Sequence, residues 1–235
     1  GASKSTVHWH VKHISLTEAQ REALRCQKQR LMACVNAKRR GKPIRPLPFR
    51  KPSWSKELIH LVAHLSFDGR VDRYGLYYYS KDYQQARHVK RLFQSLLHIT
   101  SKLRRRANGM WVVSYHNVAV AAWLSRRERG LLSVIESRRG WLRTWLKAFF
   151  DDEGHVHMRG GTRRVRATQH DLRTLEIAQR GLGTLGIRSR IDRTSLSVEI
   201  TRRENLQRFQ SLVNFSPGLT INPIRKNGIW RSEME

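Results

Sequence analysis

The sequence contains few acidic residues and only two cysteines. Of 235 residues, 46 are lysine or arginine and 18 are aspartate or glutamate, which gives a net charge of +28 at pH 7. Cys26 and Cys34 lie eight positions apart in a stretch typical of a helix. Because a helix rises ~1.5 Å per residue, they are about 12 Å apart and cannot pair with each other. No Cys/His cluster has zinc-site spacing, so we expect reduced thiols and no structural zinc.

Long apolar segments are also missing. No run of ~18 or more apolar residues predicts a transmembrane helix, and the N-terminus does not have the pattern of a signal peptide. We therefore expect an intracellular protein that has no membrane partner. A prokaryotic cytoplasm is the first expectation, and an organelle is the alternative.

Positive charge is what the sequence has in excess, and it predicts a polyanionic partner such as nucleic acid. Arginine accounts for 34 of the 46 basic residues. Its planar guanidinium suits phosphates and guanine edges, which favours a recognition surface. On charge alone, a structural RNA-binding protein fits equally well.

The N-terminal part, residues 1–54, is expected to be a basic extension and linker. Residues 1–14 contain His8, His10 and His13 and resemble a short strand or arm; they show no obvious fourth metal ligand. Residues 16–40 have the apolar stripe of a helix with a basic opposite face. Four prolines in 41–54 then predict an extended linker.

A repeat organises the rest of the chain. Two apolar helices end at Gly69 and Gly154, 85 residues apart, each with an acidic residue just before the glycine. Both are followed by hairpin, helix, hairpin and helix, so each unit is α-β-β-α-β-β-α. The expected boundaries are 55–140 for the first repeat, 141–216 for the second and 217–235 for a basic tail.

The expected elements of the first repeat are helices at 55–69, 82–97 and 117–129, a hairpin at 70–79, and strands at 99–105 and 110–115. In the second repeat we expect helices at 142–154, 171–186 and 204–213. Its expected strands are 155–159, 164–169, 188–193 and 196–201, with a turn at Gly160–Gly161.

Alternation along the strands predicts a sheet with two different faces. Arg164, Arg166 and Thr168 alternate with Val165 and Ala167. The same alternation places Arg188, Arg190 and Asp192 on one face, and likewise Ser197, Glu199 and Thr201. We expect helices to cover the apolar face and the other face to be open, with charge mostly of one sign. A two-stranded ribbon bearing arginine fits the major groove of DNA.

Two nonapeptides resemble the motif of the LAGLIDADG homing endonucleases. Leu146–Gly154 is similar to a good second motif, and Leu61–Gly69 to a degraded first one. The resemblance covers about residues 55–215. It implies a single-chain α+β fold with pseudo-twofold symmetry, in which antiparallel sheets form a DNA-binding saddle and the two motif helices pair. Phe67 and Asp152 depart from the pattern, since the family often has small residues there, and Lys147 is charged near the helix start.

Asp68 and Glu153 are the predicted catalytic and metal-binding pair. Two carboxylates at the carbonyl ends of adjacent helices repel each other unless a cation lies between them. Oxygen ligands and a phosphate substrate suit Mg²⁺, with Mn²⁺ as a substitute and Ca²⁺ as an ion that binds without supporting cleavage. Gly69 and Gly154, which let the chain turn away, are assigned to the same metal site. The alternative is two helix ends with acidic residues and no function.

The neighbouring acids receive minor roles: Asp152 is expected to be a solvated neighbour and Asp151 a helix-interface group. Gln169 is a candidate to position water. The resemblance implies a basic residue near the scissile phosphate, for which the candidates are Lys102, His116, Arg202 and Arg203. The predicted DNA-binding residues are Arg70, Arg73, Tyr77, Tyr79, Arg104, His155, His157, Arg164, Arg166, Thr168, Arg188, Arg190, Asp192 and Arg193.

Three functions follow. The first is a monomeric, site-specific, Mg²⁺-dependent endonuclease that cuts both strands of a long asymmetric DNA target, encoded within an intron, and that the resemblance implies leaves short 3′ overhangs. The second is an intron maturase that binds RNA with the same fold. The third is a DNA-binding regulator that has lost catalysis. The presence of both Asp68 and Glu153 favours the first over the third.

Overall fold

A computed structural model of the chain describes residues 15–39, 45–159, 162–217, 219–221 and 224–225. The predicted arm at 1–14, the turn at Gly160–Gly161 and residues 226–235 of the tail lie outside the described residues. The chain divides into two compact units, residues 1–44 and 45–235. No helix in the described part is both long and apolar enough to cross a membrane.

The described part of the first unit is helix α2 (Glu18–Arg39), as the sequence predicts. A reciprocal cap starts it: the backbone N–H of Gln20 donates to Thr17 Oγ1 (3.3 Å), and the backbone N–H of Thr17 donates to Gln20 Oε1 (2.9 Å). These bonds satisfy donors that have no partner inside the helix. Leu24, Leu31 and Val35, the predicted apolar stripe, are exposed within this unit.

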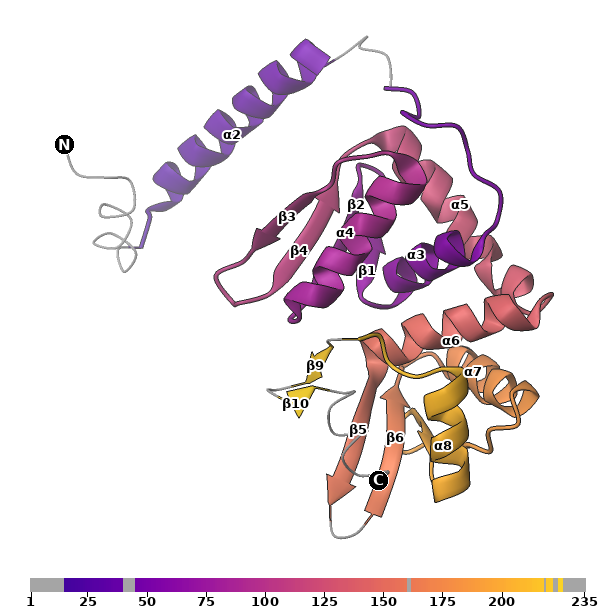
Figure 1. Cartoon of the computed structure of the whole chain (residues 1–235). Helices are drawn as coiled ribbons and strands as arrows, with labels where there is room; N and C mark the ends of the chain where they lie inside the picture. The colour runs from indigo at the N-terminus through magenta and orange to yellow at the C-terminus, as the bar shows by residue number, and fades with distance from the viewer. Residues whose placement is uncertain (1–14, 40–44, 160–161, 218, 222–223, 226–235) are drawn as a thin grey trace. The chain divides into compact units, whose positions relative to one another are not determined.

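The second unit contains the predicted repeat (Figure 1). The first copy consists of α3 (Lys56–Phe67), β1 (Gly69–Val71), β2 (Leu76–Ser80), α4 (Tyr83–Leu97), β3 (Lys102–Arg105), β4 (Trp111–Tyr115) and α5 (Val118–Ile135). The second consists of α6 (Arg139–Glu153), β5 (Gly154–Arg159), β6 (Thr162–Thr168), α7 (Leu172–Thr184), β7 (Arg190–Asp192), β8 (Ser197–Ile200) and α8 (Arg203–Leu212). Both have the predicted order α-β-β-α-β-β-α.

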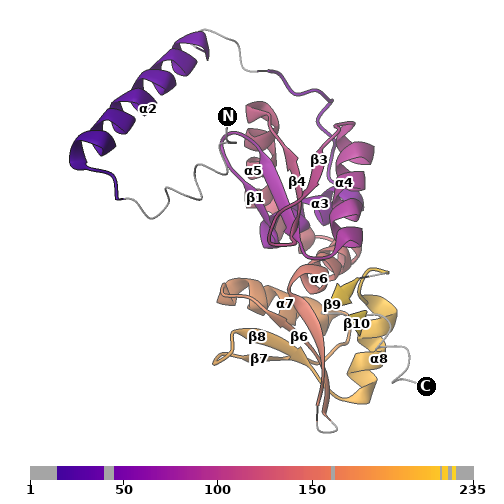
Figure 2. The same cartoon turned by 90° about the vertical axis from the view of Figure 1, so that its left-hand side faces the viewer.

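Each copy forms one four-stranded antiparallel sheet, and the two sheets have equivalent strand orders. The first sheet runs β1-β2-β4-β3 and the second β5-β6-β8-β7. Figure 2 shows the two sheets in separate halves with the helices packed against them. The apolar face of each sheet joins a common core: Val113 in β4, for example, and Val198 in β8 are fully buried.

The helix starts that the sequence predicts are formed by capping side chains. Ser55 Oγ accepts the backbone N–H of Leu58 at 3.2 Å and begins α3. Asp82 and Asp171 occupy equivalent N-cap positions of α4 and α7. The Asp82 carboxylate accepts the backbone N–H groups of Gln84 and Gln85, and that of Asp171 accepts the backbone N–H of Arg173. Such caps satisfy donors that would otherwise be unpaired, so they fix where a helix begins.

Helices α3 and α6 pack against each other, and this contact joins the two copies. Ala63 in α3 and Ala148 in α6 are fully buried. Phe67, which departs from the motif, lies against Trp145 and Phe149 with ring centroids 5.7 and 5.3 Å apart, respectively. The predicted pairing of the two motif helices is therefore confirmed, with an aromatic cluster where small residues were expected.

Several elements differ from the sequence prediction. Strand β7 covers Arg190–Asp192 instead of 188–193, so Arg188 precedes it, and β3 begins at Lys102 instead of residue 99. Helix α5 continues to Ile135 instead of ending near Arg129, because the buried Leu131 and Ile135 carry its apolar stripe past Gly130. After α8, a short antiparallel pair forms from β9 (Thr220–Ile221) and β10 (Ile224–Arg225). The described residues 45–54 of the predicted linker pack on α5, where the ring of Phe49 meets that of Trp123 at 5.3 Å.

Candidate active site and nucleic-acid interface

Asp68 and Glu153 occupy matching places at the carbonyl ends of the paired helices. Asp68 is the C-cap residue of α3, and Glu153 is the last residue of α6. Both are half-buried, and each is followed at once by the first strand of its copy. The backbone carbonyl oxygen of Asp68 accepts the N–H of Tyr79 at 3.0 Å, which ties this helix end to β2.

The glycines that follow the two acids are required by close backbone approach. A Cβ atom at Gly69 would overlap the backbone of Leu65, and one at Gly154 would overlap the backbone of Phe150. In both cases the obstacle is the last turn of the preceding helix, which cannot rotate out of the way. The two glycines therefore hold Asp68 and Glu153 against their helix ends, and their assignment to the metal site stays a prediction.

We expect Gly69→Ala and Gly154→Ala each to lower the free energy of unfolding by roughly 1–3 kcal/mol, the usual cost of forcing atoms into a packed site. Gly183→Ala in α7 is the matched control, because its Cβ would meet no atom within 4 Å. Since alanine has the higher helix propensity, the control should be neutral or up to ~1 kcal/mol more stable. Urea unfolding measures all three. Equal stability of Gly69→Ala and Gly183→Ala would contradict this account.

Gln169, the predicted water-positioning residue, lies beside Glu153. Its Nε2 donates to Glu153 Oε1 at 3.0 Å, and its backbone N–H donates to the carbonyl oxygen of Leu196 at 2.9 Å. Gln169 follows the last residue of β6, so the sheet fixes where its side chain begins. This contact gives Glu153 a defined orientation.

Asp152 is not the solvated neighbour that the sequence suggested. Its carboxylate is fully buried, and Oδ2 lies 2.8 Å from His64 Nδ1. Oδ1 accepts hydrogen bonds from Tyr78 Oη (2.7 Å) and Gln85 Nε2 (3.2 Å). Burial of a carboxylate costs free energy unless the group is paired and hydrogen-bonded, and these three partners meet that requirement. All three come from the other copy of the repeat. Asp152 therefore joins α6 to α3, α4 and β2.

Asp151 is also buried, and its carboxylate accepts the backbone N–H (2.7 Å) and the hydroxyl (2.6 Å) of Ser216. Burial raises the pKa of Asp151, against the opposing effect of the nearby Lys147 ammonium. Asp151 thus fastens the segment after α8 to the end of α6. Its expected role as a helix-interface group stays a prediction.

The pKa values of His64 and Tyr78 depend on acidic residues at the ends of both α3 and α6. Burial alone would lower the pKa of His64, but the Asp152 carboxylate, with smaller contributions from Asp151 and Asp68, raises it. Burial, followed by the charges of Asp152 and Asp68, raises the pKa of Tyr78 well above its ordinary value. Asp68 of the first motif and Asp152 of the second therefore both raise the pKa values of His64 and Tyr78.

The polar face of the second sheet brings many predicted DNA-binding residues together. Strand register makes direct neighbours of His155 and Arg166, of His157 and Arg164, and of Arg190 and Glu199. Directly opposed residues share one face of an antiparallel sheet. Val165 and Ala167, which alternate with these arginines, are fully buried on the opposite face, as predicted.

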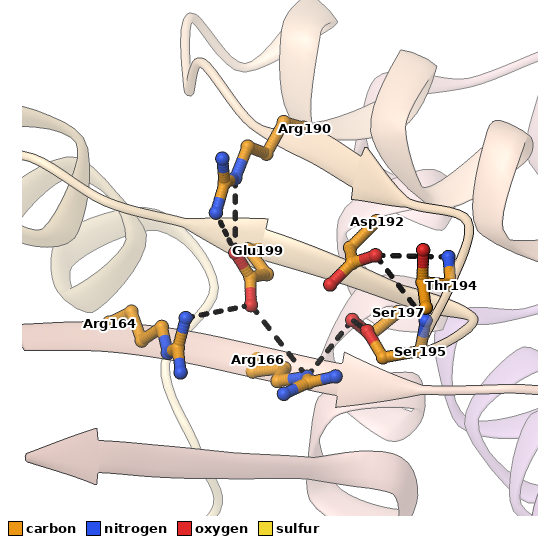
Figure 3. A network of polar contacts seen from close by, with 8 residues as sticks. All are labelled: Arg164, Arg166, Arg190, Asp192, Thr194, Ser195, Ser197 and Glu199. Atoms are coloured by element: carbon orange, nitrogen blue, oxygen red, sulfur yellow. Dashed lines mark hydrogen bonds and ion pairs between the residues drawn. The ribbon is translucent and has the colours of Figure 1, made fainter.

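Glu199 changes the character of this face, which the sequence predicted to be open and mostly of one sign. Its side chain is only 1% exposed, and Arg164, Arg166 and Arg190 surround it (Figure 3). Arg164 Nη1 donates to Oε1 at 3.1 Å and Arg190 Nη2 to Oε2 at 2.8 Å. Arg166 Nε lies 3.7 Å from Oε1 and donates to Ser197 Oγ at 2.9 Å. One buried carboxylate thus orders three arginines and partly compensates their charge.

Replacement of Glu199 by glutamine should lower the free energy of unfolding by roughly 1–3 kcal/mol, because charge-assisted bonds to a buried acceptor are lost. It should at the same time strengthen nonspecific DNA binding, since the arginines lose their compensating charge. Glu204→Gln is the control: Glu204 pairs with Arg208 at 2.9 Å on the surface, where its side chain is 72% exposed. Such pairs contribute ~0–1 kcal/mol. A Glu199→Gln protein as stable as Glu204→Gln would refute the ordering role.

The polar face of the first sheet has a different composition. The register pairs Arg70 with Tyr77, and Ser114 with both Tyr77 and Lys102. Arg104 pairs with Val112, which in turn faces Tyr79. Arg70, Lys102 and Arg104 are exposed. The rings of Tyr77 and Tyr79 are parallel to within 15°, with centroids 6.3 Å apart, and Tyr77 Oη lies 2.8 Å from His116 Nε2.

The remaining predicted residues lie at strand ends and turns. Arg73 is in the β1–β2 turn, where its guanidinium contacts Tyr74. Asp192 Oδ1 accepts the backbone N–H groups of Thr194 (3.0 Å) and Ser195 (3.3 Å), so it shapes the turn that contains Arg193. Arg202 has a left-handed backbone with φ 64° and lines a hollow together with Arg188 and Arg190. The half-buried Thr168 ends β6, and the exposed Arg203 begins α8.

Sequence reasoning missed a group of three histidines, His60, His64 and His88. One ring nitrogen from each lies within 4.8 Å of the other two, an arrangement able to hold a metal ion. The spacing of His60 and His64 was the available signal, because residues four apart share one face of a helix. The third member comes from α4 and is adjacent only in the folded chain.

The comparisons with known proteins agree on the fold. Residues 140–214 match the family model described as a LAGLIDADG-like domain. A crystal structure of I-DmoI in complex with DNA and Ca is 16% identical, covers 75% of this chain and 97% of that chain, and has a TM-score of 0.54. A variant of I-DmoI in complex with its target DNA in the presence of Mg is 15% identical, with coverage of 67% and 95% and a TM-score of 0.54.

A crystal structure of the N-terminal LAGLIDADG domain of DUF199/WhiA is also similar. It is 13% identical, covers 72% of this chain and 89% of that chain, and has a TM-score of 0.53. No curated protein sequence matches the chain. At these identities the structural likeness concerns the fold, and the predicted resemblance to the LAGLIDADG architecture is confirmed.

Proposed function

We propose that this chain, which has the LAGLIDADG fold and a LAGLIDADG-like domain over residues 140–214, is a site-specific endonuclease that hydrolyses both strands of duplex DNA. The observation that carries the proposal is the matched pair of acids. Asp68 and Glu153 end two helices that pack together, and each precedes a glycine that tolerates no side chain. Acidic residues are unfavourable at the carbonyl end of a helix unless a cation offsets them.

The donor chemistry of Asp68 and Glu153 fits a hard divalent cation. Both offer carboxylate oxygens, both are half-buried, and oxygen donors are the ligands that Mg²⁺ prefers. When bound there, Mg²⁺ would supply Lewis acidity to the scissile phosphate and lower the pKa of bound water. Gln169 holds Glu153 in place through its 3.0 Å hydrogen bond. We assign Gln169 the task of orienting Glu153 and the attacking water.

The two polar sheet faces are proposed as the DNA-binding surface. Their exposed or half-exposed cations, together with a net charge of +28, suit the phosphate backbone of a duplex. In the second sheet, Glu199 holds Arg164, Arg166 and Arg190 in fixed positions, which lowers the entropy that these side chains lose on binding. In the first sheet, Tyr77 and Tyr79 present their rings beside Arg70 and Arg104. The two copies therefore offer different side chains, and we expect an asymmetric target.

Incubation with a randomised duplex library and Mg²⁺ tests this function. Sequencing of the cleaved ends should recover one enriched site with cuts on both strands. Binding to one duplex sequence without cleavage would instead identify a DNA-binding regulator. Selective binding to a folded intron RNA, with no preference among DNA duplexes, would favour a maturase.

A further inference from the structure

The three-histidine cluster combines residues of two helices in the first copy. His60 and His64 are one turn apart on α3, and His88 lies on α4. The ring centroid of His60 lies 4.5 Å from that of His64 and 5.1 Å from that of His88. The ring centroids of His64 and His88 are 6.0 Å apart. One nitrogen from each ring lies within 4.8 Å of the others. Among the described residues, no other group of three or more His, Cys, Asp or Glu side chains has this geometry.

All three histidines share an unusual feature: their Nε2 atoms are buried and have no hydrogen-bond partner. His64 is fully buried. A buried polar atom without a partner costs free energy, and such atoms are rare in folded proteins. Three of them in one cluster are available to bond a shared ligand.

The second copy of the repeat shows that the fold itself does not require histidine here. Equivalent positions, aligned on the motif glycines and on the N-caps Asp82 and Asp171, hold Trp145, Phe149 and Ile177, all buried. Where His64 contacts Asp152 in one copy, Phe149 contacts Phe67 in the other. An apolar filling is thus compatible with this architecture, and the polar cluster is particular to the first copy.

The surroundings prepare the histidines for a ligand. Asp152 Oδ2 bonds Nδ1 of His64 at 2.8 Å and leaves Nε2 available, the arrangement by which a carboxylate orients a metal-binding imidazole. Burial lowers the pKa of His88 to about 4 and that of His60 well below its ordinary value, with smaller contributions from His64, Lys147 and Arg91. Burial acts on His64 in the same direction, but the Asp152 carboxylate outweighs it and raises the pKa of that ring. Lys147 Nζ donates to the carbonyl oxygen of Asn214 at 3.3 Å.

We propose that His60, His64 and His88 bind one divalent transition-metal ion of the Zn²⁺ class through a ring nitrogen each, with Asp152 as the orienting carboxylate. Nitrogen ligands select zinc, cobalt or nickel over magnesium, so this site is chemically distinct from Asp68 and Glu153. Ligands of tetrahedral zinc at ~2.0–2.1 Å are about 3.4 Å apart, so small ring movements close the cluster around the ion. The ion would connect α3 to α4 and, through Asp152, to α6.

Cobalt provides the test, because tetrahedral Co²⁺ absorbs strongly in the visible range and octahedral aqueous Co²⁺ does not. Chelator-treated full-length protein, without an affinity tag, should develop this absorption with Co²⁺, lose it when Zn²⁺ is added, and keep it when Mg²⁺ is added. His88→Ile, which installs the residue of the second copy, should lose one equivalent of bound Co²⁺ and the absorption. Asp152→Asn should retain the site with about 10–100-fold weaker affinity.

His98→Asn is the matched control, since His98 is an exposed C-cap residue with φ 51°, which asparagine tolerates. The N-terminal histidines His8, His10 and His13 are present in every variant, so their metal binding cancels in the comparison. Zn²⁺ should also raise the melting temperature of the wild type and His98→Asn but leave that of His88→Ile unchanged. Absence of the tetrahedral spectrum in the wild type, or its persistence in His88→Ile, would overturn the proposal. Neither result bears on DNA cleavage.

Discussion

Asp68→Asn and Glu153→Gln are each expected to reduce cleavage of the selected duplex by at least about 1,000-fold, which corresponds to ~4 kcal/mol of transition-state stabilisation. Each change removes one negative oxygen donor from the proposed Mg²⁺ site and keeps the size of the side chain. The affinity for duplex DNA should stay within about twofold, because the two polar sheet faces are unchanged. Single-turnover cleavage and fluorescence-anisotropy binding measure the two quantities separately.

Glu136→Gln is the control for the loss of one negative charge. Glu136 is exposed and pairs with Arg180 at 3.2 Å on the surface, where the two side chains are 53% and 62% exposed. It should cleave at the wild-type rate. If Asp68→Asn and Glu153→Gln both cleave as fast as Glu136→Gln, the acids are not catalytic. Loss of binding together with cleavage would instead give them a structural role.

The parts of the fold that the sequence predicted are those with local signals. Asp82 and Asp171 each cap the first turn of the helix that follows them. Gly69 and Gly154 stand where the chain leaves a helix, because any Cβ atom there would overlap the last helical turn. These features need only neighbouring residues, and the repetition of the motif glycines 85 positions apart predicted the two-copy architecture. The alternation in β6 likewise predicted which face is buried, because side chains alternate along a strand.

What the sequence could not predict depends on contacts between distant elements. Asp152 adjoins two acids and a glycine at a helix end, which is typical of a solvated residue. Its burial is possible only because His64, Tyr78 and Gln85 reach it from the other copy. Glu199 alternates with apolar residues in β8 and should face solvent. It is buried instead because arginines from two neighbouring strands close over it.

The affinity for duplex DNA should fall by about 10³–10⁵ between 50 and 200 mM salt, as expected for ~6–10 neutralised phosphates. The physical basis is the release of counterions, since the two polar sheet faces and a net charge of +28 replace cations on the DNA. If about ten phosphates are contacted, the log–log slope is about −9. Anisotropy titrations over a salt series measure it, with a nonspecific duplex of equal length as the comparison.

Substitutions on the first sheet show whether that slope comes from the proposed surface. Arg70 and Arg104 are exposed on the polar face of β1 and β3, so Arg70→Gln and Arg104→Gln should each make the slope less negative by about 0.9. Arg180→Gln is the control, because Arg180 lies on α7 and is paired with Glu136. It should leave the slope unchanged. A wild-type slope near about −2, or equal effects of all three substitutions, would mean that the charge acts diffusely and that the sheets do not contact the duplex along their length.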